Sequence, residues 1–237
     1  MGENMYKKVL IAAAIAVVLF QIGSLMVSEE KDTYADTDIN KIKVKEINEE
    51  PTHKKSDYVE GEKPLYIDDI LVVNKDYGLP SNYAPDSGSE DTEAMEAFNE
   101  MKAAAKKDGI IINLRSGYRS YYTQVQLYND YVRRDGKEAA DRYSAIPGFS
   151  EHQTGLALDI TTGNSKKSIG PWFDETPQAK WLYENAYKYG FVLRYPKGKE
   201  DVTGYMYESW HYRYIGKEDS KNFKMNDLTL EEYLGLK

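Results

Sequence analysis

The sequence has three histidines, and two of them lie in short motifs that also contain acidic residues. His152 stands seven residues before Asp159 in the segment SEHQTGLALDI, and His211 stands three residues after Glu208 in ESWHYRY. Imidazole and carboxylate groups are suitable zinc ligands, and the chain has no cysteine to offer instead. Two histidines and one aspartate would leave a fourth coordination position for water, as in hydrolytic zinc sites. We therefore predict one zinc ion held by His152, Asp159 and His211.

Glu208 fits a catalytic role in such a site. Water bound to catalytic zinc has a pKa of about 7, and a nearby carboxylate can take its proton and pass it to a leaving amine. We therefore predict that Glu208 is the general base. Each residue alone also has a structural explanation, because a lone buried histidine is usually structural and a strand aspartate can cap a turn. The pairing of two histidines with acids favours the metal site.

The spacing of these residues requires two bends in the chain. Side chains an odd number of residues apart on a regular strand point to opposite faces, and both His152–Asp159 and Glu208–His211 have odd spacing. We expect residues 153–155 to bend the chain between the first pair. Ser209 is expected to lie in a kink that turns Glu208 toward the metal.

The segment that follows His152 has the alternation of a strand. One face is apolar and is expected to be buried: Leu156, Leu158 and Ile160. The other face carries Gly155, Ala157 and Asp159. We expect the two small residues to leave room around the ion.

Helix and strand signals indicate the elements that position these motifs. Ser120 is expected to cap a helix, and Thr229 with Glu232 has the pattern of a capping box. Helices grouped between strands without regular alternation predict an α+β fold with a central, mainly antiparallel sheet and flanking helices. The expected helices are 90–107, 121–134, 137–145, 177–190 and a short terminal one, and the expected strands are 70–73, 110–114, 156–160, 191–195 and 205–215.

The N-terminal part of the chain differs in composition from the rest. Two lysines precede an apolar run, and acidic residues follow it, which places the following part outside the cytoplasm. A cleaved signal peptide and a buried core helix are the alternatives to a membrane anchor. We predict a cytoplasmic N-terminus at 1–8, a transmembrane anchor or signal peptide at 9–27, a charged flexible tether at 28–64 that contains the third histidine, and a globular domain at 65–237.

Composition excludes several classes of partner and site. The net charge is −8, which argues against a nucleic-acid partner because such a partner requires a basic surface. The absence of cysteine excludes disulfides, thiolate metal sites, a cysteine nucleophile and a lipid-modified cysteine.

Three blocks of the sequence resemble one known family. SGYRS at 116–120, PGFSEHQTGLALDI at 147–160 and YESWHYRY at 207–214 are similar to the signature blocks of the VanY-type D-alanyl-D-alanine carboxypeptidases. These are zinc peptidases related to the D,D-dipeptidases and to the Hedgehog N-terminal fold. The resemblance covers about residues 65–216. It implies a sheet with flanking helices around one zinc site.

The resemblance implies the same zinc ligands and the same base. It further implies that Arg119 contacts the substrate, either at a carboxylate or at the polarised carbonyl, for which its planar fork of donors is suited. Gln124 and Ser150 match positions that hold the terminal D-alanine carboxylate. The alternatives are a structural ion pair for Arg119, a surface position on a helix for Gln124 and a turn for Ser150. Arg115 and Arg213 have no comparable match, so we expect structural salt bridges for both.

The chain departs from the family pattern at one position of the last block. The family usually has proline where this chain has Ser209. Serine keeps the ligands but would loosen the kink that aims Glu208. We therefore expect this departure to affect the rate of catalysis more than the type of reaction.

The expected function is that of a zinc-dependent carboxypeptidase that removes the C-terminal D-alanine from peptidoglycan stem peptides, by D,D or L,D cleavage. The alternatives are a cell-wall endopeptidase or D,D-dipeptidase of the same metal group, and a non-catalytic module that binds peptidoglycan. The expected location is the bacterial cell surface, with the catalytic domain outside the membrane, or secreted if the N-terminal segment is cleaved. We expect a monomer.

Overall fold

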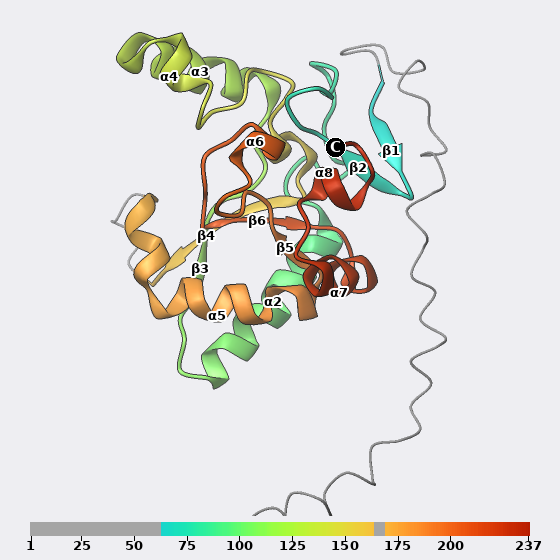
Figure 1. The fold of residues 1–237 in the computed structure, drawn as a ribbon, viewed down its shortest axis with the longest axis vertical. Coiled ribbons are helices and arrows are strands. Elements are labelled where there is room, and N and C mark those ends of the chain that lie inside the picture. Colours follow the sequence, from blue (N-terminus) through green and yellow to red (C-terminus); the bar gives the residue numbers. More distant parts are fainter. Residues whose placement is uncertain (1–62, 164–168) are drawn as a thin grey trace, which may run out of the picture. The chain divides into compact units, whose positions relative to one another are not determined.

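The computed structural model describes residues 63–163 and 169–237 (Figure 1). Its strands are β1 (Leu65–Ile67), β2 (Ile70–Val72), β3 (Ile112–Ser116), β4 (Ala157–Thr162), β5 (Phe191–Leu193) and β6 (His211–Tyr214). Its α-helices are α2 (Thr92–Lys107), α3 (Tyr121–Asp135), α4 (Lys137–Ala140), α5 (Pro177–Asn185), α6 (Glu200–Thr203), α7 (Lys217–Asn226) and α8 (Leu230–Tyr233). Short 3-10 helices are η3 (Glu151–Thr154), η4 (Pro171–Glu175) and η5 (Ala186–Tyr189).

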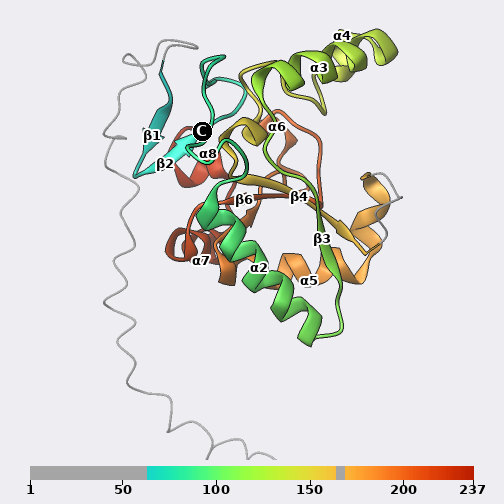
Figure 2. The ribbon, with the colours of Figure 1, turned by 180° about the vertical axis from the view of Figure 1, so that it is seen from behind.

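A four-stranded sheet with the order β3-β4-β6-β5 forms the centre of the described fold. Every neighbouring pair in it is antiparallel, and β1 and β2 form a separate antiparallel hairpin. Helices α2 and α5 lie on one side of the sheet, and α3 and α4 lie on the other side in both views (Figure 1, Figure 2). The predicted α+β fold with an antiparallel sheet and flanking helices is therefore confirmed.

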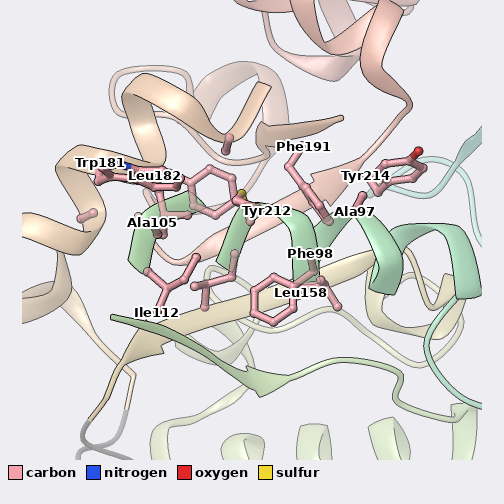
Figure 3. Close-up of a cluster of buried hydrophobic side chains, with 14 of the residues drawn as sticks. Ala97, Phe98, Ala105, Ile112, Leu158, Trp181, Leu182, Phe191, Tyr212 and Tyr214 are labelled. Carbon is pink, nitrogen blue, oxygen red and sulfur yellow. The ribbon is translucent and has the colours of Figure 1, made fainter. Parts of the chain in front are cut away.

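One face of the sheet forms the main core. Leu158 and Ile160 of β4 are fully buried there, as predicted, against Phe98 and Met101 of α2 and Leu182 of α5 (Figure 3). Because side chains alternate along a strand, Ala157 and Asp159 point to the opposite face. The packing of the apolar face thus fixes which residues the sheet presents on its polar side.

Several predicted boundaries are confirmed by the cap contacts. The Ser120 side chain accepts a hydrogen bond from the Thr123 N–H at the start of α3, and the α3 helix ends at Gly136. Thr229 and Glu232 form the reciprocal capping box at α8. The helix predicted from residue 90 begins at Thr92, because Asp91 caps it.

Other predicted elements are wrong in length or position. The strand expected at 205–215 is only β6, because the alternating aromatic residues before it make separate contacts: the Tyr205 ring lies 4.8 Å from that of Tyr195, and Tyr207 donates a hydrogen bond to Asp174. Strand β3 starts two residues later than expected, because the Ile110 N–H closes the end of α2 by donating to the Ala105 carbonyl.

The same holds for two helices and one strand. The helix expected at 137–145 is the four-residue α4, followed by a turn, and the strand expected at 191–195 is the three-residue β5. The helix expected at 177–190 consists of α5 and then η5, and it ends at Gly190 in the left-handed conformation.

The predicted N-terminal elements fall where the structure gives no description. The cytoplasmic N-terminus at 1–8, the membrane segment at 9–27 and the tether up to residue 62 lie outside the described residues. Within 63–163 and 169–237, no helix has the length and apolar character that a membrane span requires.

Candidate metal centre

His152 reaches the polar face of the sheet through a bend. It lies in η3, and Gly155 closes that 3-10 helix with φ of 74°, in the left-handed region that favours glycine. The expected bend at 153–155 is therefore present. A Cβ on Gly155 would lie 2.7 Å from Pro85 Cγ and 2.9 Å from the Asp91 nitrogen. The room left by Gly155 is thus taken by the loop before α2, which corrects the expectation that it faces the ion.

Asp159 and His211 come together through strand pairing. They are direct partners in the antiparallel β4–β6 register, so their side chains share one face of the sheet. Asp159 Oδ1 lies 3.2 Å from His211 Nδ1, and Asp159 Oδ2 lies 3.3 Å from His152 Nε2. All three residues are buried, and one ligand atom from each lies within 4.8 Å of the others.

This group has the chemistry of a metal site. Two imidazoles and a carboxylate suit zinc, and Asp159 Oδ1 is buried close to His211 Nδ1 without a hydrogen bond to satisfy it. Among the described residues, no other group of three or more His, Cys, Asp or Glu side chains converges in this way. The donor set therefore fits a zinc ion.

The two histidines present different ring nitrogens to Asp159. His152 Nδ1 lies 2.7 Å from the carbonyl oxygen of Gly117, which follows the register shift between Leu114 and Ser116 in β3. His211 Nε2 lies 3.3 Å from Glu151 Oε2. Each ring thus has one nitrogen bound to an acceptor and the other turned toward Asp159.

Glu208 lies in a turn directly before β6. The His211 N–H donates to the Glu208 carbonyl at 3.3 Å, and the Glu208 N–H donates to the Tyr195 carbonyl at 3.1 Å. Glu208 Oε2 is thereby placed 3.6 Å from His211 Nδ1. Ser209 is buried inside this turn, so the kink expected from the odd spacing is present.

Burial and neighbouring charges set the pKa values of the site. Burial raises the pKa of Glu208 to about 8, and burial lowers the pKa of His152. Burial alone would raise the pKa of Asp159, but His152 and His211 outweigh it and hold that pKa below its ordinary value. Burial would lower the pKa of His211, but the nearby carboxylates of Asp159 and Glu151 outweigh it and raise that pKa to about 9. The acidic groups around both rings favour a bound cation.

Arg119 faces the same cavity as the metal-ligand group. This cavity has a volume of about 460 Å³, and its lining includes Arg119, Ser150, Asp159 and Glu208. No carboxylate of the described residues lies within ion-pair distance of the Arg119 guanidinium, so the structural alternative for it fails. The lining also includes residues of α3, of the segment after α4 and of two later loops: Leu127, Tyr131, Arg134, Tyr143, Ile169 and Trp210.

Gln124 lies behind Arg119 and is buried. Its Oε1 accepts a hydrogen bond of 2.8 Å from Arg119 Nη1, while its Nε2 donates to the Ala145 carbonyl at 2.6 Å. The surface position considered for it is therefore wrong. Arg119 Nη2 also donates to Ser116 Oγ at 3.3 Å, so the guanidinium is held at two of its nitrogens.

The sequence analysis did not identify Glu151. Its carboxylate lies between His211 on one side and its two arginine partners, Arg194 and Arg213, on the other. Arg213 Nη1 lies 2.8 Å from Glu151 Oε1, which confirms the structural salt bridge expected for Arg213. Arg115 is exposed and makes no such bridge within the described residues, so that expectation is wrong. Ala157 pairs directly with Arg213, so the room that it leaves is beside that side chain. The sequence places Glu151 next to His152, but that position alone does not indicate burial or a role in the site.

The family model for D-alanyl-D-alanine carboxypeptidase, VanY, matches residues 88–217. The chain belongs to this family. It is 44% identical over 180 residues to the Bacillus subtilis (strain 168) protein YodJ, covering 69% of this chain and 66% of that protein. It is 40% identical over 145 residues to a D-alanyl-D-alanine carboxypeptidase of Enterococcus faecium, covering 60% of this chain and 43% of that protein. The chain thus spans less than two thirds of the length of these relatives.

Solved structures of the family share the fold. The LD-carboxypeptidase LdcB matches with a TM-score of 0.65 and 40% identity, covering 73% of this chain and 93% of that chain. A variant of the vancomycin resistance D,D-pentapeptidase VanY in complex with Zn(II) matches with a TM-score of 0.60 and 33% identity, covering 69% of this chain and 97% of that chain. The structural neighbours therefore include both an LD-carboxypeptidase and a D,D-pentapeptidase.

Proposed function

We propose that this chain is a zinc-dependent carboxypeptidase that removes the C-terminal D-alanine from peptidoglycan stem peptides. The observation that carries the proposal is the convergence of His152, Asp159 and His211 in one cavity with Glu208 and Arg119. A relative named as a D-alanyl-D-alanine carboxypeptidase and a structural neighbour bound to Zn(II) support the substrate class and the metal.

The metal and Glu208 have separate roles in the proposed reaction. A zinc ion held by His152, Asp159 and His211 would supply Lewis acidity for the attack of water on the scissile carbonyl. Glu208 accepts the proton of the attacking water and returns it to the amine of D-alanine as the peptide bond breaks. Burial favours proton uptake by Glu208, because it disfavours the charged carboxylate.

Arg119 is proposed to bind the substrate. Its guanidinium can pair in a bidentate manner with the carboxylate of the terminal D-alanine, or donate to the scissile carbonyl oxygen. Gln124 supports that role from behind by holding Nη1. Direct contacts of Gln124 and Ser150 with the D-alanine carboxylate stay a prediction.

Two substrates are consistent with this site. Cleavage of a pentapeptide after D-alanine and cleavage of a tetrapeptide after an L-centre both release one D-alanine. The L,D-carboxypeptidase neighbour LdcB is 40% identical to this chain and the D,D-pentapeptidase VanY is 33% identical, which favours the tetrapeptide. The cell-wall substrate of such neighbours also supports an extracytoplasmic role for the globular domain predicted at 65–237.

The test uses the full chain, loaded with zinc and incubated separately with a stem pentapeptide and a stem tetrapeptide. Loss of one alanine by mass spectrometry, abolished by a chelator and restored by zinc, is the expected result. Release of a dipeptide would support a D,D-dipeptidase, and a cut within a cross-linked stem would support an endopeptidase. Zinc and peptide binding without turnover would support the non-catalytic module.

A further inference from the structure

We propose that Glu151 is a positioning residue of the metal site, which holds the His211 ring so that its Nδ1 faces the metal. The inference rests on the proposed function only in that a metal ion binds His152, Asp159 and His211. Nothing in the chemistry proposed above uses Glu151, although its side chain is buried beside two ligands.

Both carboxylate oxygens of Glu151 are engaged, and they have different partners. Oε1 accepts hydrogen bonds from Arg194 Nε at 2.7 Å and Arg213 Nη1 at 2.8 Å. Oε2 lies 3.3 Å from His211 Nε2. The two arginines therefore fix the carboxylate, and the remaining oxygen is directed at the imidazole.

The negative charge of Glu151 sets which nitrogen of the His211 ring carries the proton. A carboxylate next to Nε2 keeps the proton on Nε2, which leaves the Nδ1 lone pair free for a metal and makes it more basic. His152 has a neutral backbone carbonyl in the corresponding place. Tyr195 packs on the His211 ring with a centroid distance of 4.9 Å, so the plane of the ring is held as well.

The carboxylate itself is held by a network that reaches the C-terminal helix. Arg194 donates through Nη1 and Nη2 to Glu231 of α8 at 2.9 and 2.6 Å, and Asn74 donates to Glu231 Oε1 at 3.3 Å. Glu151, Glu231, Arg194 and Arg213 are all almost fully buried, and their formal charges cancel. Such a balanced set keeps each charge paired, because an unpaired buried charge is strongly unfavourable.

The first test reads the tautomer of each ring in the zinc-loaded full chain by long-range proton–nitrogen NMR with labelled histidine. The expected result is a proton on Nε2 and a metal on Nδ1 for His211, and the reverse for His152. A metal or an empty lone pair on His211 Nε2 would overturn the proposal. This measurement needs no variant, so a folding defect cannot obscure it.

The second test compares Glu151→Gln with a matched control. The control is Glu232→Gln in α8, at the residue directly after Glu231. This change removes a half-buried ion pair with Lys199, but glutamine can still complete the capping box. We expect Glu151→Gln to weaken zinc binding about tenfold or more in a chelator competition and to change the visible spectrum of the cobalt-substituted protein. We expect Glu232→Gln to change zinc affinity by less than about twofold. A folded Glu151→Gln chain with wild-type zinc affinity would contradict the proposal.

A third variant reports on the network if Glu151→Gln does not fold. Glu231→Gln leaves the ligands and Glu151 in place but weakens the hold on Arg194, and we expect a loss of zinc affinity of about threefold. An unchanged affinity would overturn the role of the network. These measurements are independent of turnover: a chain that binds zinc as described but cleaves no peptide would contradict the proposed function and leave this inference standing.

Discussion

Asp159 of β4 and His211 of β6 are direct partners in an antiparallel strand pair, and their side-chain atoms approach to 3.2 Å. The sheet register therefore sets the distance between two of the three candidate ligands. His152 joins them from η3, outside the sheet. A change that shifts the β4–β6 register by one residue would turn Asp159 to the apolar face and remove the site.

Asp159→Asn should greatly weaken zinc binding. The asparagine keeps the size of the side chain but loses the charge that pairs with the cation. We expect zinc affinity to fall by more than about 100-fold, because loss of a group that only supports a ligand already costs about 10–100-fold. Chelator competition measures this, and an affinity within tenfold of wild type would show that Asp159 is not a ligand.

Glu208→Gln should retain zinc and lose activity. Without a base that can take the proton of water, turnover is expected to fall by about 100- to 10,000-fold. The exposed Glu138→Gln on α4 serves as a control for a change of one charge. Turnover of Glu208→Gln near the wild-type rate would rule out the proposed role of this carboxylate.

Arg119→Lys should impair catalysis although the charge is retained. Lysine lacks the planar fork that Gln124 and Ser116 hold in place, so it cannot bind a carboxylate through two parallel bonds. We expect kcat/KM to fall by about 10- to 100-fold, the equivalent of about 1.5–3 kcal/mol for a hydrogen bond to a charged group. Arg115→Lys, four residues earlier and exposed, is the matched control and should leave kcat/KM unchanged.

Gly155→Ala should destabilise the fold by more than the backbone conformation alone requires. Gly155 and Gly109 have φ of 74° and 76°, but only at Gly155 would a Cβ meet neighbouring atoms, at 2.7 Å or more. Gly109→Ala is expected to cost about 1–2 kcal/mol for the left-handed conformation. Gly155→Ala should cost clearly more in urea unfolding, and equal values for the two variants would contradict the close approach of the loop before α2.

Ser209→Pro should be tolerated and should stabilise the chain slightly. The hydrogen bond from the His211 N–H to the Glu208 carbonyl makes Ser209 the second residue of a turn, a position that favours proline. Among the described residues, the Ser209 N–H makes no backbone hydrogen bond that proline would remove. We expect the free energy of unfolding to rise by about 0.4–1 kcal/mol with zinc affinity unchanged. A marked loss of stability would show that the turn has a different geometry.

The sequence was sufficient to predict that His152, Asp159 and His211 converge, because histidine is rare in this chain and each of the three residues stands in a distinctive block. The apolar face of β4 and the caps of α3 and α8 were also predictable, since they depend on local patterns. Glu151 was not. Its role depends on Arg194 and Arg213, which lie 43 and 62 residues further along the chain, and a glutamate beside a histidine gives no local sign of burial.

The lengths of β5 and β6 could not be predicted for a related reason. Alternating tyrosines before His211 resemble a strand, but Tyr205 and Tyr207 are engaged by Tyr195 and Asp174 from other parts of the chain. Contacts of this kind override the local preference of the backbone. The same override explains why Gly155, expected to make room for an ion, makes room for a loop.

The pairing of Arg194 with Glu231 has a consequence for where the catalytic unit ends. The family match stops at residue 217, yet Glu231 in α8 neutralises Arg194, which also pairs with Glu151 beside the candidate metal site. A fragment cut at 217 would leave that guanidinium in the interior with half of its counter-charge missing. Loss of α8 should therefore reduce the cooperativity with which the whole domain unfolds. An excised catalytic unit has to extend through α8 to fold on its own.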